Sequence, residues 1–192
     1  MTLGLSDEDR ELRDSVRGWA ARHATPEVIR AAVDAETETR PSFWGSFADL
    51  GMLGLHLPED VGGAGFGYLE TAVVAEELGR AMVPGPFLPT VITSAVLNEA
   101  GRRAELEGLA NGALYGAVSL QPGRLRIVRD GASVSLSGTS GVVLGGQVAD
   151  VFLLAADDGG ERAFVVVARD RIGVTDLPSY DVVRRNAEIT AD

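Results

Sequence analysis

The 192-residue sequence has no cysteine, no lysine and no long uninterrupted hydrophobic run. Without cysteine, disulfides, thiol chemistry and cysteine-based metal sites are excluded. No apolar run approaches the ~20 residues that a membrane-spanning helix needs, and segment 3–10 turns acidic where a signal peptide would be apolar. These absences predict a soluble protein that is not associated with a membrane, and the lack of cysteine suits a cytoplasmic location.

Positive charge and histidine are also scarce. The net charge is −11, because 28 scattered Asp and Glu residues outnumber 17 arginines. An acidic surface repels phosphate backbones, so a nucleic-acid partner is disfavoured. The two histidines, His23 and His56, are far apart and have no partners at metal-ligand spacing, so no metal site is expected.

The first 110 residues carry apolar residues at helical spacing. Ser6 and the acidic residues after it form a capping-box pattern, and Leu12, Val16, Trp19 and His23 follow at spacings of four, three and four. This pattern predicts an amphipathic helix. Further helices are expected near 42–50, 68–82, 90–100 and 103–110, with a short extended piece at 53–57.

After Leu114 the pattern changes to short alternating or buried runs separated by turn residues such as Asp130-Gly131. Helices followed by strands, without alternation, indicate an α+β fold of two segregated units. We therefore expect a helical domain over residues 1–112 and an antiparallel β domain over residues 113–192. Strands are predicted at 114–120, 125–129, 133–136, 151–155 and 163–167.

Two motifs at a fixed spacing give the chain a family likeness. The stretch GMLGLHLPEDVGGAG at residues 51–65 is followed by VAEELGR at residues 74–80. Together they resemble the acyl-CoA dehydrogenase family, and the likeness extends over most of the chain. In that family a helical domain precedes a β-barrel-like middle domain and a C-terminal four-helix bundle. The resemblance implies that these 192 residues hold the first two domains and that the bundle is absent.

The family reaction takes a proton from Cα of an acyl-CoA thioester and passes a hydride from Cβ to the flavin of FAD. The family's base is a glutamate of the C-terminal bundle, so the resemblance implies no catalytic residue in this chain. Four carboxylates of the first domain are available, but solvated or capping charge is the plainer interpretation of each. They are Glu59, Glu70, Glu76 and Glu77.

The flavin-contacting motifs of the family are altered here. Leu120-Gln121-Pro122-Gly123 matches a threonine-glutamate-proline-glycine stretch, and the segment from Val142 to Leu144 matches tryptophan-any-threonine. Two hydroxyls and a ring are lost, although a flavin needs donors at its polar edge and stacking on its face. The resemblance implies that the substituted residues still line the former cofactor cleft. They are Leu120, Gln121, Val142 and Leu144.

Two functions stay open. The first is a subunit of an FAD-dependent acyl-CoA dehydrogenase that acts on a bulky or steroid-derived acyl-CoA beside a related subunit. Such a hetero-oligomer would resemble actinobacterial enzymes built from two unlike subunits. The second is a non-catalytic scaffold that completes a partner's active site. A lineage that binds FAD through backbone groups is a further alternative. A phosphate-binding loop at 62–67 is disfavoured, because it follows a turn and lacks the Lys-Ser/Thr pair.

Overall fold

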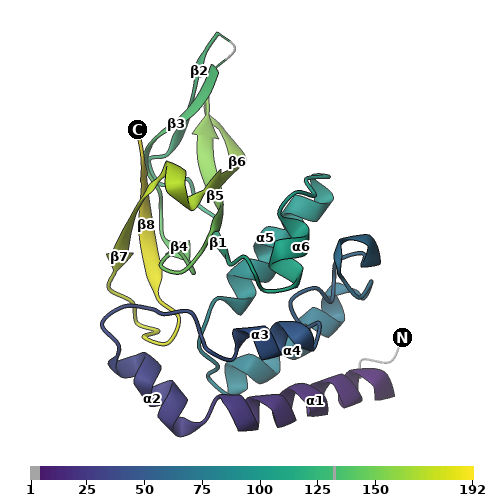
Figure 1. The fold of residues 1–192 in the computed structure, drawn as a ribbon. Coiled ribbons are helices and arrows are strands. Elements are labelled where there is room, and N and C mark those ends of the chain that lie inside the picture. The colour runs from purple at the N-terminus through teal and green to yellow at the C-terminus, as the bar shows by residue number, and fades with distance from the viewer. Residues whose placement is uncertain (1–4, 132) are drawn as a thin grey trace.

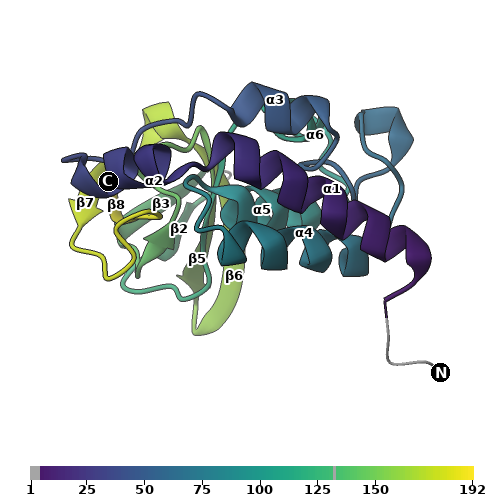
Figure 2. The ribbon, with the colours of Figure 1, turned by 90° about the horizontal axis from the view of Figure 1, so that it is seen from below.

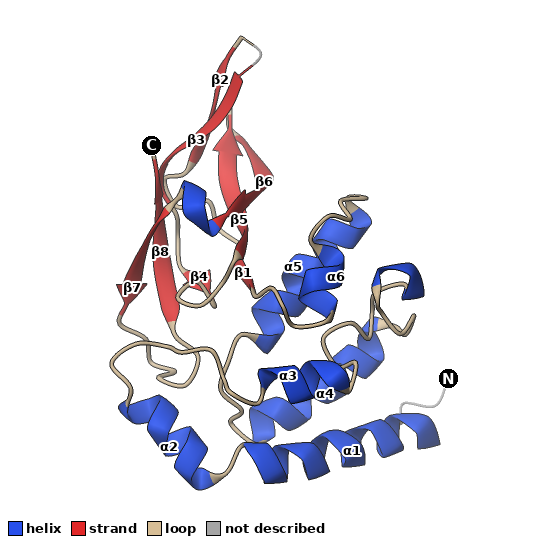
Figure 3. Ribbon diagram, in the orientation of Figure 1, coloured by secondary structure: helices blue, strands red, loops and turns tan. Residues whose placement is uncertain are grey.

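In the computed structural model, which describes residues 5–131 and 133–192, a group of helices packs beside a strongly twisted sheet (Figure 1). Helices fill the first part of the chain and strands the second, so the predicted order is confirmed (Figure 3). The helices are α1 (Asp7–His23), α2 (Pro26–Asp34), α3 (Trp44–Asp49), the 3-10 turn η1 (Glu59–Val61), α4 (Tyr68–Arg80), α5 (Phe87–Glu99) and α6 (Leu106–Ala110).

The capping box at the start of α1 is present. The backbone N–H of Asp9 donates to Ser6 Oγ at 3.0 Å, and the carboxylate of Asp9 accepts from the Ser6 N–H at 2.9 Å. Helix α2 was not predicted, although Thr25 caps it and Pro26 occupies its first turn. None of its residues is buried, although its sequence is amphipathic.

The helical domain is held by an aromatic core. Trp19 of α1 lies 4.7 Å from Phe47 of α3 between ring centroids, and Phe47 meets Phe87 of α5 edge to face at 5.6 Å. The ring of Tyr115, just before the first strand, stacks on Trp44 at 4.9 Å. The core of the helices therefore extends to the entry of the β domain. Figure 2 shows α1 lying across α4, with α2 in front of the strands.

Segment 53–57, expected to be extended, is a chain of turns. The Leu57 N–H donates to the Gly54 carbonyl at 3.0 Å, so the backbone curls back on itself. The glycine-rich segment 62–67 folds over it so closely that a Cβ at Gly63 would lie 2.0 Å from the Leu57 carbonyl oxygen. Gly63 therefore serves this close backbone approach, whereas Gly62 adopts a positive φ of +81°.

The second part of the chain forms one eight-stranded sheet with the order β1-β4-β8-β3-β2-β5-β6, in which β7 pairs with β8. Most pairs are antiparallel, as expected, but β1 runs parallel to β5. Strand β2 also runs parallel to β5 at one residue pair, so the sheet is mixed rather than purely antiparallel as expected. The strands are β1 (Gly116–Ser119), β2 (Arg126–Asp130), β3 (Ser133–Thr139), β4 (Val143–Leu144), β5 (Val151–Asp158), β6 (Glu161–Ala168), β7 (Gly173–Leu177) and β8 (Asn186–Ala191).

The parallel pair arises where the two domains meet. The Tyr115 carbonyl accepts from the N–H groups of Asp150 and Val151 at 2.9 and 3.1 Å, and the Asp150 carboxylate accepts from the Tyr115 N–H at 3.0 Å. Strands β1 and β5 therefore start side by side and run in the same direction. Parallel pairing across so many residues leaves no local sequence pattern, which is why it was not predicted.

Candidate functional site

The loop after β1 lies directly against the segment before β4. Gly123 has a positive φ of +59°, and a Cβ there would lie 2.2 Å from the backbone nitrogen of Gly141. Val118 pairs with Leu144 across β1 and β4. The two segments that were matched to the family's flavin motifs, 120–123 and 142–144, are therefore neighbours at one end of the sheet.

The four residues expected at the cofactor cleft carry exposed side chains. Leu120 is 52% exposed, Val142 55% and Leu144 37%, and Gln121 is exposed as well. Scattered single exposed apolar residues are ordinary on protein surfaces, whereas contiguous exposed apolar residues mark binding faces. Three exposed apolar side chains on two adjacent segments therefore make this face a candidate binding surface.

The hydroxyls nearest these segments are already engaged within the fold. Ser119 Oγ donates to the Gln121 carbonyl at 2.9 Å. Ser140 Oγ donates to the Gly141 carbonyl at 2.6 Å and accepts from the Ile189 N–H at 2.8 Å. Both serines are buried, so neither offers a donor to the surface. The side chains of the four matched residues, apart from the Gln121 amide, do not fit the polar edge and ring face of a flavin.

The four carboxylates of the helical domain have local partners or turn positions. Glu70 caps α4 by accepting from the Gly67 N–H at 2.9 Å, and Glu76 pairs with Arg80. Glu77 is buried, and the hydrogen bond from Arg17 holds the pKa of its carboxyl below the usual range. Glu59 begins the η1 turn. A carboxylate with a lowered pKa is a weak proton acceptor, so Glu77 is poorly suited to act as a base.

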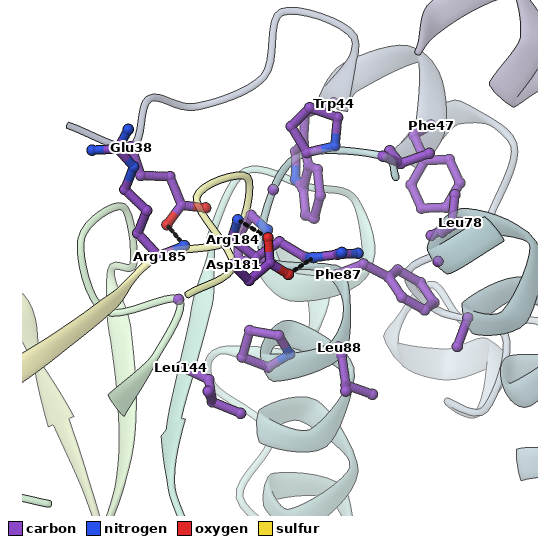
Figure 4. A pocket seen from close by; sticks show the side chains of 18 of the residues that line it. Glu38, Trp44, Phe47, Leu78, Phe87, Leu88, Leu144, Asp181, Arg184 and Arg185 are labelled. Carbon is purple, nitrogen blue, oxygen red and sulfur yellow. Dashed lines mark hydrogen bonds and ion pairs between the residues drawn. The ribbon is translucent and has the colours of Figure 1, made fainter. Parts of the chain in front are cut away.

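A cavity of about 320 Å³ lies between the helices and the sheet, close to Leu144 (Figure 4). Its wall is mostly apolar, with several aromatic and proline side chains, and charged groups lie on one side. Its lining includes Trp19, Phe43, Trp44, Phe47, Leu78, Val83, Pro84, Pro86, Phe87, Leu88, Pro89, Leu144, Glu38, Asp181, Arg184 and Arg185. Of the residues matched to the flavin motifs, Leu144 alone belongs to this lining.

Among the acids that line this cavity, Glu38 has the pKa that departs furthest from its ordinary value. One oxygen of its carboxyl accepts from the Arg185 N–H at 3.1 Å, and its own N–H donates to the Gln147 side chain at 2.8 Å. The other oxygen, Oε1, has no hydrogen-bond partner among the described residues. Burial raises the pKa of Glu38 to about 7. Sequence reasoning missed Glu38, because its partners are more than 100 residues away and its own loop has no periodic pattern.

The histidines do not form a metal centre. His56 Nε2 lies 3.0 Å from Ser94 Oγ, and its ring stacks on Tyr68. Burial lowers the pKa of His56, which keeps the ring neutral. In residues 5–131 and 133–192 no group of three or more His, Asp or Glu side chains is placed to hold a metal ion. No helix in the same ranges has both the length and the apolar character required to cross a bilayer.

Comparison with known proteins decides the family. Residues 6–112 match the model of the acyl-CoA dehydrogenase N-terminal domain. The acyl-CoA dehydrogenase IpdE2 of Mycolicibacterium smegmatis is 34% identical over 186 residues, which are 96% of this chain and 52% of the relative. The chain belongs to the acyl-CoA dehydrogenase family. FadE34 of Mycobacterium tuberculosis is 35% identical over 190 residues, 94% of this chain and 26% of the relative.

Solved structures of the family have the same fold. A variant of the Tcur3481-Tcur3483 steroid ACAD is 28% identical with a TM-score of 0.86, covering 97% of this chain and 55% of that one. The ChsE4-ChsE5 complex from Mycobacterium tuberculosis is 24% identical with a TM-score of 0.89, covering 100% and 56%. This acyl-CoA dehydrogenase chain thus spans about half the length of these solved chains and of IpdE2. The family uses FAD as its cofactor, and one member of the fold is a glutaryl-CoA dehydrogenase in complex with FADH2.

Proposed function

We propose that this chain is a subunit of an FAD-dependent acyl-CoA dehydrogenase that introduces an α,β double bond into an acyl-CoA, and that its own flavin site is degenerate. The observation that carries this proposal is the character of the surface formed by Leu120, Val142 and Leu144. In the motif match from the sequence, apolar side chains stand where the family has two hydroxyls and a ring. The nearby serine hydroxyls are engaged within the fold. This surface lacks the donors that a flavin edge requires.

A related acyl-CoA dehydrogenase subunit is the proposed partner, in a hetero-oligomer that binds the acyl-CoA substrate. Two structural relatives are described as pairs of unlike chains, Tcur3481-Tcur3483 and ChsE4-ChsE5. The first of these is described as a steroid ACAD, which supports a bulky or steroid-derived acyl group as the substrate here. The division into domains 1–112 and 113–192 and a cytoplasmic location belong to the same proposal. The end of the family match at residue 112 supports the first of these.

A non-catalytic scaffold is the second candidate. The exposed apolar face of Leu120, Val142 and Leu144 suits contact with a partner better than contact with a flavin edge. In this alternative the chain supplies a surface that completes the partner's active site. The two candidates differ in whether flavin binding by the assembly requires residues of this chain.

The test is to purify the chain, add excess FAD and measure flavin absorbance after gel filtration, first alone and then co-expressed with a related full-length subunit. We expect a colourless lone chain and a yellow assembly. Stoichiometric flavin on the lone chain would overturn the degenerate site. If the assembly keeps its flavin and activity after Val142→Asp, the chain acts only as a scaffold at a distance from the cofactor.

A further inference from the structure

Strand β6 forms one end of the sheet. It pairs with β5 on one side, and no strand in the described part of the chain pairs with its other side. Figure 2 shows β6 at the margin of the molecule. We propose that this free edge pairs with the same edge of a second copy of the chain, in antiparallel orientation, and so joins two chains into a dimer. The inference does not depend on the proposed function, because it concerns the chain by itself and not its flavin.

The hydrogen bonds between β5 and β6 identify the backbone groups that point to the free edge. The Arg169 N–H, directly after β6, donates to the Asp150 carbonyl at 3.0 Å, and the register continues from there with Val151 opposite Ala168. In an antiparallel ladder, residues that bond to the neighbouring strand alternate with residues that do not. The residues of β6 whose N–H and carbonyl groups point away from β5 are therefore 162, 164, 166 and 168.

Strand β6 lacks the features that usually protect a free edge from pairing, which are proline, lysine, a bulge or a short length. Its eight residues include no proline, glycine or lysine, and they pair with β5 without a bulge. Residues 163–167 are all apolar, and Phe164 is 47% exposed. The five-residue edge strand β7, in contrast, contains Gly173 and the exposed Asp176. Strand β6 is therefore the edge that is better suited to pairing.

The backbone pattern favours one register for two copies of β6. Residues 162, 164, 166 and 168 must pair with one another across the twofold axis, so the axis passes through a residue and not between two residues. With the axis at Val165, residue 162 lies opposite 168 and residue 164 lies opposite 166. All four outward-pointing residues of each strand are then paired within β6. An axis at Phe164 or Val166 leaves one of them without a partner in the strand.

The charges at the two ends of β6 complement each other in this register. Glu161 of one copy lies opposite Arg169 of the other, and the twofold axis repeats the pair. The guanidinium of Arg169 donates to the neutral carbonyls of Gly146 and Ala149, which leaves its charge uncompensated. Within residues 5–131 and 133–192, no ion pair includes Glu161 or Arg169. The same surface meets itself, so the interface closes at two chains and forms no fibre.

Sedimentation of the full chain over a range of concentrations tests the proposal. We expect a reversible dimer. Phe164→Lys places a cation at the centre of the edge and removes a cross-strand pair with Val166 twice over, so dimerisation should weaken about tenfold. Val134→Lys, at an apolar position of β3 that is 61% exposed, is the matched control and should leave the dimer unchanged. Circular dichroism checks that both variants are folded.

A single cysteine tests the register, and the absence of cysteine from the sequence makes the test specific. Val165→Cys places two thiols opposite each other at a non-hydrogen-bonded pair, where the Cα atoms lie about 4.5 Å apart, within the range of a disulfide. We expect this variant to form a disulfide-linked dimer on mild oxidation. Ala163→Cys is the control, because its two copies lie four residues apart along the paired strands.

Three results would each overturn the proposal. The first is a monomer at every concentration up to the solubility limit, which would mean that solvent or another partner covers β6. The second is a dimer that Phe164→Lys does not weaken, which would place the interface elsewhere on the chain. The third is a yield of crosslinked Val165→Cys no higher than that of Ala163→Cys. The crosslinking decides the outcome if Phe164→Lys does not fold.

Discussion

The guanidinium of Arg17 on α1 donates two hydrogen bonds to the carboxylate of Glu77 on α4. Nε donates to Oε2 at 2.9 Å and Nη2 donates to Oε1 at 2.8 Å. Glu77 is 2% exposed, while half of the Arg17 side chain faces solvent. This paired geometry is directional and fixes the crossing of two helices whose side chains otherwise interact through apolar contacts.

Acid should weaken this link. The hydrogen bond from Arg17 lowers the pKa of Glu77 below its ordinary value of 4.5. The contribution of the Arg17–Glu77 pair to stability is therefore fully present above pH 4.5, the pKa of Glu77 in the unfolded chain. It is lost as the pH falls through the lowered pKa of Glu77 in the folded state. We expect Arg17→Met to lower the thermal midpoint at pH 7 and to leave a smaller acid-induced decrease below pH 4.5, measured by circular dichroism. Arg22→Met, at an exposed position of the same helix whose charge does not act on Glu77, is the control.

Glu38 should give the opposite dependence on pH. Burial raises its folded-state pKa from 4.5 to about 7, so the native state binds more protons than the unfolded chain between these values. Stability should rise as the pH falls from about 7 toward 4.5, and Glu38→Gln should remove this slope and stabilise the protein at pH 8. A shift of this size corresponds to at most roughly 3 kcal/mol, and partial solvation reduces it to roughly 1–2 kcal/mol.

Urea unfolding at several pH values measures this effect. Glu36→Gln, an exposed neighbour in the same loop, should leave the slope unchanged. A slope that persists in Glu38→Gln would assign the dependence to another group.

Gly123 should tolerate no side chain. Its φ of +59° costs a non-glycine residue about 1–2 kcal/mol, and its Cβ would lie 2.2 Å from Gly141 N. Gly123→Ala should therefore destabilise the fold by at least about 3 kcal/mol. Gly159 has a similar φ of +67° with open space around it, so Gly159→Ala should cost only about 1 kcal/mol. Equal losses in denaturant titrations would mean that the loop separates from the sheet at little cost.

Restoring the family residues should restore part of a flavin site. The substitutions Leu120→Thr, Val142→Trp and Leu144→Thr add two hydroxyls and a ring at an exposed face. Together they should strengthen the binding free energy of FAD by about 1.5–4.5 kcal/mol, which corresponds to at least about tenfold tighter binding. Quenching of FAD fluorescence measures this. Val128→Thr with Val134→Trp, on exposed positions of the β2–β3 hairpin, is the control. Unchanged affinity in the triple variant would mean that these positions do not contact flavin.

Capping and turn residues in the sequence predicted the helices and turns whose formation depends on nearby residues. The Ser6 capping pattern located the start of α1, and the Pro-Glu-Asp and glycine segments were recognised as turns. Helix α2 was missed although Thr25 and Pro26 carry a start signal and its 9 residues are amphipathic. Strands β7 and β8 were also missed. Their assignment rests on pairing with each other and, for β8, with β3 and β4.

Local sequence signals also identified only part of the candidate sites, because the rest depends on contacts between distant residues. The family motifs identified segments 120–123 and 142–144, and the structure places them side by side. That they once lined a flavin cleft stays a prediction. The cavity could not be predicted, because Glu38 and Arg185 meet only after the two domains have packed. Its unpaired atoms depend on tertiary burial, which no spacing in the sequence encodes.

The position of β8 sets the order in which the chain can fold during its synthesis. This strand pairs with β3, β4 and β7, yet its residues, Asn186–Ala191, leave the ribosome after all three. The helices can pack while translation continues, but the edges of those three strands stay open until residue 191 has emerged. Open strand edges are where nascent chains aggregate. Slow translation through segment 140–185 would therefore prolong the interval in which this protein is most dependent on chaperones.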